Sequence, residues 1–212
     1  MSRGKNNITL LANRYIKKSK QVETVVVEKG GLDDIINVII SADGQAAPFM
    51  TDFAPLLKNG EDYKTLKNIW RFTRRHIQYV PDRTGHEKIK SPGATWASKY
   101  ADCKSMSVFI GSILRNLGYN YIYRVVFYDK DTPERGHIYP VVLLPNGRQV
   151  IVDAVHYTFD EELPYWKGYD YYPETGNKAA INGTPKTNWI TLAIIGGSVL
   201  LFSLNNRQKI TA

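Results

Sequence analysis

The chain has 212 residues, of which 43% are hydrophobic and 23% charged, and its formal net charge is +8. This composition is typical of a globular protein of one ordinary domain with appendages, and it excludes a disordered chain, a collagen-like fibre and a coiled-coil rod. The single cysteine, Cys103, excludes an intrachain disulfide and so a disulfide-stapled secreted mini-protein. The mean hydropathy of −0.33 excludes a polytopic membrane protein but not a single span.

The positive charge lies mainly at the two ends of the chain. Residues 1–30 hold seven basic and two acidic side chains, whereas residues 31–206 hold 19 basic and 18 acidic ones. A nearly neutral body argues against nucleic-acid binding, which usually requires a basic stripe on a folded face. We expect the basic N-terminal arm to be a solvated tail, with contact to anionic lipid or nucleic acid as the alternative. The apolar run at residues 8–12 is too short for a signal peptide, so none is predicted.

Helical patterns dominate the first half of the chain. After the basic arm, which ends in a short strand over residues 22–28, helical spacing of apolar residues begins at Leu32. A second helix is predicted over about residues 62–79, followed by a polar loop over residues 81–92. A third helix is predicted from about Asp102 to Leu117, with Gly118 as its C-terminal stop.

The period then changes to that of strands. Three runs rich in Val, Ile and Tyr follow at residues 121–128, 137–144 and 149–156, and the Pro-Asn-Gly-Arg sequence at residues 145–148 predicts a hairpin between the last two. Helices followed by an antiparallel sheet predict an α+β domain, which we assign to residues 31–160.

The last fifty residues are predicted to connect this domain to a membrane. Residues 161–186 are rich in Tyr, Pro, Gly and Asn, which predicts a loop-rich connector. Residues 187–206 carry no charge and are long enough to cross a bilayer core of about 30 Å, so a transmembrane helix is predicted, with a buried core helix as the alternative. A short basic tail, residues 207–212, follows, and the flanking charges leave the orientation open.

Three residues form the candidate catalytic constellation. Cys103 follows an Asp at the predicted start of a helix, where backbone N–H groups and the helix dipole favour a nucleophilic thiolate. His137 opens one strand and Asp153 closes the next, so the hairpin brings both near the same end of adjacent strands. An Asp that orients an imidazole, and an imidazole that takes a proton from a thiol, need this arrangement. The alternative is a small buried cysteine and an unrelated strand histidine.

Residues 91–117, with GHIYPVVL around His137 and VIVDAVH around Asp153, resemble the core of the transglutaminase-like superfamily of papain-related thiol enzymes. The upstream stretch at residues 62–82 resembles the helix that precedes the cysteine loop in that superfamily, and the resemblance is greatest to small phage or mobile-element members. It implies a transglutaminase/papain-like fold over residues 32–160, with Cys103 as nucleophile, His137 as general base and acid, and Asp153 as the orienting carboxylate.

The sequence departs from the superfamily pattern at two positions beside the cysteine. Ala101 stands where Gly is usual, which matters if that residue needs a positive φ. Lys104 stands where an acidic residue is common, and it either favours the thiolate or points to solvent. Trp96 is a candidate wall of the acyl groove, with a core tryptophan as the alternative. The histidine spacing predicts no zinc site, and no cofactor is predicted.

Taken together, these features predict a membrane-anchored thiol enzyme that cleaves or transfers an amide or isopeptide bond through a Cys103 acyl-thioester. Its partners would be a peptide or protein amide substrate, such as cell-wall peptides, and a lipid bilayer reached through residues 187–206, in a virion or another membrane. The alternative is a non-catalytic virion or membrane structural protein that retains the fold. A nucleic-acid tether through residues 1–20 is the weakest candidate, since the body is neutral.

Overall fold

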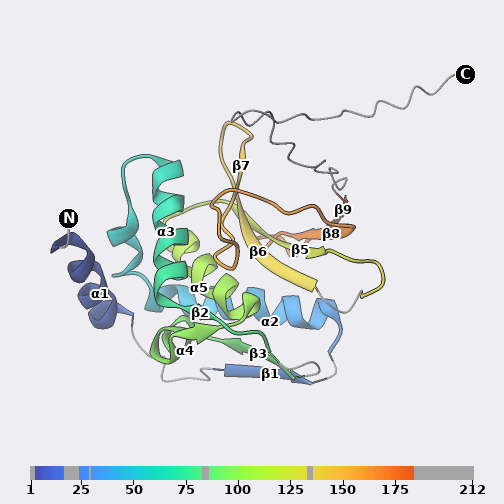
Figure 1. Ribbon diagram of the computed structural model, residues 1–212, viewed down its shortest axis with the longest axis horizontal. Coiled ribbons are helices and arrows are strands. Elements are labelled where there is room, and N and C mark those ends of the chain that lie inside the picture. Colours follow the sequence, from blue (N-terminus) through green and yellow to red (C-terminus); the bar gives the residue numbers. More distant parts are fainter. Residues whose placement is uncertain (1–2, 17–23, 29, 83–85, 133–135, 184–212) are drawn as a thin grey trace, which may run out of the picture.

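The first half of the chain is mainly helical and the second half forms an antiparallel sheet (Figure 1). The computed structural model describes residues 3–16, 24–28, 30–82, 86–132 and 136–183. The predicted α+β architecture is confirmed. In chain order the elements are α1 (Arg3–Tyr15), β1 (Thr24–Glu28), α2 (Leu32–Ala46), α3 (Asp62–His76), β2 (Gln78–Tyr79), β3 (His86–Lys90), α4 (Pro92–Ser98), β4 (Tyr100–Ala101), α5 (Cys103–Asn116), β5 (Tyr121–Phe127), β6 (Gly136–Leu143), β7 (Gln149–Ile151), β8 (Lys167–Tyr171) and β9 (Lys178–Asn182), with short 3-10 turns at Ala47–Phe49 and Ala54–Leu57.

The main sheet has five strands in the order β7-β6-β5-β8-β9, and every neighbouring pair is antiparallel. The hairpin predicted at residues 145–148 joins β6 to β7, and Gly147 at its tip has a φ of 81°, which glycine adopts without strain. Pairing continues one residue beyond β7, because the N–H of Val152 donates to the carbonyl of Pro140. The hairpin therefore sets the position of residue 153 relative to the first residues of β6.

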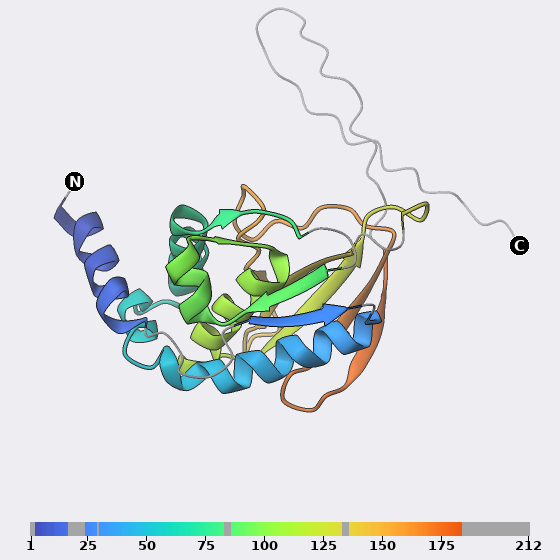
Figure 2. The ribbon, with the colours of Figure 1, turned by 90° about the horizontal axis from the view of Figure 1, so that it is seen from below.

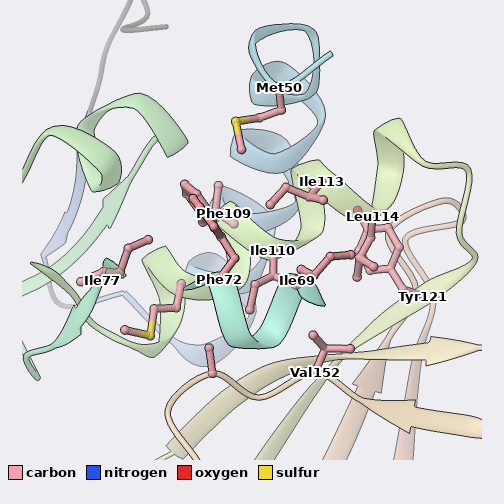
Figure 3. Close-up of a cluster of buried hydrophobic side chains, with 14 of the residues drawn as sticks. Met50, Ile69, Phe72, Ile77, Phe109, Ile110, Ile113, Leu114, Tyr121 and Val152 are labelled. Atoms are coloured by element: carbon pink, nitrogen blue, oxygen red, sulfur yellow. The ribbon is translucent and has the colours of Figure 1, made fainter. Parts of the chain in front are cut away.

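Helix α5 is the central element of the main core. Every residue from Lys104 to Leu114 is buried, because the helix packs against α3 and α2 on one side and the sheet on the other. Figure 3 shows Ile69 and Phe72 of α3 beside Phe109 and Ile110 of α5, with Val152 closing the cluster from the sheet. A helix held on all sides presents its first residue with little freedom, which matters for Cys103.

The segment predicted to be a loop-rich connector, residues 161–186, instead contributes two strands to the sheet. β8 pairs with β5 and β9 pairs with β8. Tyr165, just before β8, joins Ile122 and Val126 of β5 in a second, smaller apolar cluster. Tyrosine suits a strand that buries its ring while the hydroxyl reaches a polar partner, so the Tyr-rich composition belongs to a sheet rather than a linker.

The N-terminal arm is also more ordered than predicted. Residues 3–15 form α1, and both Ala12 and Ile16 are buried in the main core. The side chain of Asn13 accepts a hydrogen bond from the indole N–H of Trp96 at 3.0 Å. The described part of the arm is therefore docked on the domain, and the expectation of a solvated tail is wrong for residues 8–16.

Short elements were missed around the cysteine loop. The helix predicted to end near residue 79 ends at His76, and Gln78 and Tyr79 form β2, which pairs in parallel with β4. The predicted loop over residues 81–92 contains β3, which pairs with β1 of the N-terminal segment. Figure 2 shows this β1–β3 ribbon lying along α2.

Within the described ranges, no helix combines the length and the apolar composition needed to cross a bilayer. The predicted transmembrane helix, residues 187–206, and the tail at residues 207–212 lie outside those ranges.

Candidate active site

Cys103 is the first residue of α5, and its side chain is partly exposed. Asp102 caps the helix, with its Oδ1 accepting the backbone N–H of Ser105 at 2.9 Å. Among the described non-glycine residues, positive φ angles occur only at Lys99 and Asp160. Ala101 is in β4 with ordinary strand geometry, so the replacement of the usual glycine there introduces no backbone strain.

His137 lies near the start of β6, and its Nε2 is 2.7 Å from Oδ2 of Asp153. Two further hydrogen bonds hold Asp153. Its Oδ1 accepts the N–H of Val155 at 2.9 Å, and its carbonyl accepts the indole N–H of Trp70, on α3, at 2.8 Å. The carboxylate is thus fixed from the hairpin and from α3, and it in turn orients the imidazole.

Cys103 lies close enough to His137 to act on the imidazole. Burial by itself lowers the pKa of His137, but the hydrogen bonds to Asp153 and Cys103 and their negative charges outweigh burial and raise this pKa to about 10. The structure therefore brings together all three residues singled out from the sequence. The imidazole stays protonated at neutral pH as long as its two partners carry negative charge.

Two tyrosines that the sequence did not single out lie beside this group. Burial, together with negative charge at Cys103 and Asp102, raises the pKa of Tyr79 to about 12, so the phenol stays neutral. Tyr79 is 41% exposed, and the parallel register pairs it with Ala101, two residues before the cysteine. The ring of Tyr128 stacks on that of His137, with centroids 6.2 Å apart.

A signal for Tyr79 could have been found only by recognising β2. The periodicity places Tyr79 at the end of the helix predicted over residues 62–79, and the two-residue strand β2 has no periodicity of its own. Tyr128 follows β5 directly, opposite the first residues of β6, so its place depends on the strand register.

Trp96 does not line a surface groove. Its side chain is 5% exposed and stacks on Phe72 of α3, with ring centroids 5.4 Å apart. The ammonium of Lys99 covers the indole ring at 2.8 Å from its centroid. Trp96 therefore occupies the place of a core tryptophan, the alternative considered for it, and we assign it no substrate contact.

Lys104 does not point to solvent, one of the two placements considered for it. Its side chain is buried and its amino group contacts carboxylates of Asp82, Glu87 and Asp102. Burial disfavours the charged form of Lys104, but Asp102, Cys103 and Glu87 outweigh it and raise the pKa of the lysine above its usual value. Lys104 is therefore a buried cation beside the cysteine.

A hollow of about 470 Å³ lies beyond the end of β5. Its walls include Tyr128, which stacks on His137, and Trp166, whose ring is half exposed. None of the three candidate catalytic residues lines this hollow, and its lining mixes aromatic side chains with the charged Asp129, Lys130 and Asp131.

No family model matches the chain. No curated protein matches it either. Among solved structures, a "putative protease" from Parabacteroides distasonis is similar with a TM-score of 0.51 and 12% identity over 79% of this chain and 36% of that one. Legionella pneumophila LapG in its calcium-bound form is similar with a TM-score of 0.44 and 15% identity, over 72% of this chain and 93% of that one. A "putative cysteine protease" from Cytophaga hutchinsonii has a TM-score of 0.40 and 13% identity, over 93% of this chain and 63% of that one.

The chain thus spans about a third of the length of the P. distasonis structure. At 12% identity the similarity is one of fold alone, and it agrees with the α+β arrangement predicted from the sequence. The transglutaminase-like assignment stays a prediction. The link to phage or mobile-element proteins stays a prediction.

Proposed function

We propose that this protein is a thiol enzyme of the cysteine-peptidase or transglutaminase type, with Cys103 as nucleophile, His137 as general acid and base, and Asp153 as the orienting carboxylate. One observation carries the proposal: His137, hydrogen-bonded to Asp153, interacts with Cys103 at the capped start of a buried helix. Nucleophile, base and orienting group in hydrogen-bond contact are the signature of covalent catalysis.

In the first half-reaction, the Cys103 thiolate attacks the carbonyl carbon of an amide. A C–S bond forms, the C–N bond breaks, and protonated His137 gives its proton to the departing amine. The product is an acyl-thioester on Cys103. The backbone N–H of Cys103 belongs to the first turn of α5 and has no acceptor within the helix, so it can bind the developing oxyanion.

In the second half-reaction, neutral His137 takes a proton from water or from an amine, which attacks the thioester carbonyl. The C–S bond breaks, the acid or new amide leaves, and the thiolate–imidazolium pair is restored. Hydrolysis and transfer differ only in this nucleophile, so the exclusion of water from the acyl site decides between them. Tyr79, which pairs with Ala101, and Tyr128, which stacks on His137, are the groups that we propose to shield the thioester.

The substrate and the setting are further proposals. A peptide or protein amide, including cell-wall cross-links, fits the chemistry of the site. An anchor through residues 187–206 is proposed from its uncharged length alone. Deleting residues 187–212 should leave the domain folded and release it from membranes, and misfolding of the truncated chain would contradict the anchor.

The proposed activity is tested with fluorescent casein as a hydrolysis substrate and with dansylcadaverine as an amine acceptor. The wild-type protein should cleave casein or incorporate the amine, and Cys103→Ala should abolish either activity while keeping the fold. An acyl-enzyme adduct on Cys103, seen by intact mass after acid quench, would identify the covalent step. Activity that persists in Cys103→Ala, or no labelling of Cys103 by any electrophile, would leave the non-catalytic alternative.

A further inference from the structure

The buried lysine next to the nucleophile holds three carboxylates that no step of the proposed mechanism uses. Lys104 is 7% exposed. Its Nζ lies 2.5 Å from Oε2 of Glu87 and 3.5 Å from Oδ2 of Asp82, and it also contacts Oδ2 of Asp102. These residues come from three separate segments: the residues after β2, strand β3 and the N-cap of α5.

The three carboxylates lie close enough to share one cation. One oxygen from each lies within 4.8 Å of the others. Calcium binds oxygen ligands at about 2.3–2.6 Å, so two oxygens on one ion are at most about 5 Å apart. Three buried or half-buried negative charges at that spacing repel one another unless a cation stands between them. In this chain a side chain, the Lys104 ammonium, supplies that cation.

Asp102 links this cluster to the reactive cysteine. Its Oδ1 caps α5 by accepting the N–H of Ser105, and its Oδ2 contacts Lys104, so both oxygens of one carboxylate are engaged. Without the lysine, the carboxylate would lose the partner that fixes its plane. The N-cap geometry sets the direction in which the first turn, and hence Cys103, faces His137.

We propose that Lys104 is a positioning residue whose ammonium group takes the place of a structural divalent cation among Asp82, Glu87 and Asp102, so that the start of α5 is held for catalysis without a metal. The inference deepens the proposed function, and its catalytic part rests on the proposal that Cys103 is the nucleophile. The structural part is that the three carboxylates need a cation and that Lys104 supplies it. Stability measurements can test this part without any activity.

The test removes the internal cation and offers an external one. Lys104→Ala leaves space for a hydrated ion and removes the positive charge, so its Tm should fall by roughly 5–15 °C. Adding about 5 mM CaCl₂ should restore at least half of that loss, whereas KCl at equal ionic strength should not, because calcium accepts a cluster of carboxylate oxygens. The wild-type Tm should change by less than about 1 °C with CaCl₂ or with EDTA, since its site is already filled.

Lys88→Met is the matched control. Lys88 follows Glu87 in β3, its side chain is exposed, and its loss also removes one positive charge. It should change neither the Tm nor the calcium response. The rate at which iodoacetamide labels Cys103 should fall about tenfold or more in Lys104→Ala and recover with calcium in parallel with the Tm. The Lys104→Arg variant keeps the charge and should remain calcium-independent.

An unchanged Tm in Lys104→Ala, or a loss that calcium does not reverse, would overturn the inference. If Lys104→Ala fails to fold in buffer, folding in the presence of calcium supports the inference and continued failure overturns it. A wild-type Tm that rises with calcium or falls with EDTA overturns it as well. Failure of the proposed function is distinguishable, since the Tm pattern would then hold in a protein whose Cys103 forms no acyl-enzyme.

Discussion

Helix α5 carries an ionic cluster with a buried carboxylate at each end, and only one of the two is a candidate active site. At its start, Lys104 and Asp102 flank Cys103. At its end, Arg115 donates to Asp43 at 3.2 Å and to Glu174 at 2.7 Å, and the hydroxyl of Tyr121 donates to Asp43.

Both clusters perturb pKa values. Burial raises the pKa of Asp43, and burial and Asp43 together raise that of Tyr121. Yet among the described residues this end of the helix has no nucleophile in contact with a base, and Asp43 is completely buried. The difference teaches that buried charge alone does not make a reactive site. The partly exposed sulfur in contact with His137 sets the start of the helix apart.

The comparison predicts opposite outcomes for substitutions at the two ends, and the largest effect concerns the cysteine. Cys103→Ala removes a partly exposed thiol from a capped helix start, so the free energy of unfolding should change by no more than about 1–2 kcal/mol. Acyl-enzyme formation should fall below detection. Chemical denaturation and intact-mass analysis of one preparation measure both. A large loss of stability would show that Cys103 is a core residue, and the start of α5 would then not differ from its end.

Asp153→Asn should reduce the rate of acyl transfer by about 10²–10⁴-fold while the protein stays folded. The amide keeps the size of the carboxylate but donates where it should accept, which favours the wrong imidazole tautomer and removes the charge that holds the His137 proton. Single-turnover kinetics on a thioester-forming substrate measure the rate. A loss smaller than about threefold would mean that Asp153 does not orient the base.

Arg115→Met tests the other end of the helix. It leaves the buried Asp43 without its cation, and because Arg115 is itself partly exposed we expect a loss of about 2–4 kcal/mol of stability. The rate of Cys103 labelling at low temperature, where the variant remains folded, should match that of the wild type. A variant that is stable but unreactive would show that the two ends are coupled through the helix.

The pH dependence of stability should distinguish the histidine from the surrounding charges. The folded pKa of His137 is raised, despite burial, to about 10 by Asp153 and Cys103, above its ordinary value of 6.5. Its contribution to stability is therefore fully present below pH 6.5 and is lost as the pH rises through about 10. The Tm difference between the wild type and His137→Gln should accordingly shrink between about pH 7 and 10. A difference that grows over that range would give the pKa shift the opposite sign.

Sequence patterns predicted the elements that have a local signal of their own and missed the strands that depend on pairing with a distant segment. Helix α5 and the β6–β7 hairpin were recognisable because an apolar stripe and an Asn-Gly turn are local signals. Strands β8 and β9 were missed because their tyrosines and glycines become strand residues only when β5 offers an edge. The two-residue strands β2 and β4 exist only through each other.

The same distinction separates the residues of the candidate site. Cys103, His137 and Asp153 could be nominated because each sits at the end of a predicted element. Lys104 could not be placed, because its partners Asp82 and Glu87 lie in a segment that read as a polar loop. Trp96 illustrates the converse, since proximity in sequence to the cysteine suggested a groove wall and tertiary packing buried it.

The most direct test of the thiol-enzyme proposal is the second-order rate of Cys103 alkylation by iodoacetamide at pH 6, compared between the wild type and His137→Ala. At this pH a free thiol is almost fully protonated and reacts slowly. Contact with a protonated imidazole should keep the sulfur reactive, so the wild type should label at least about tenfold faster than free cysteine, and His137→Ala should lose that advantage. Equal rates in the two proteins would contradict the proposal that His137 activates Cys103.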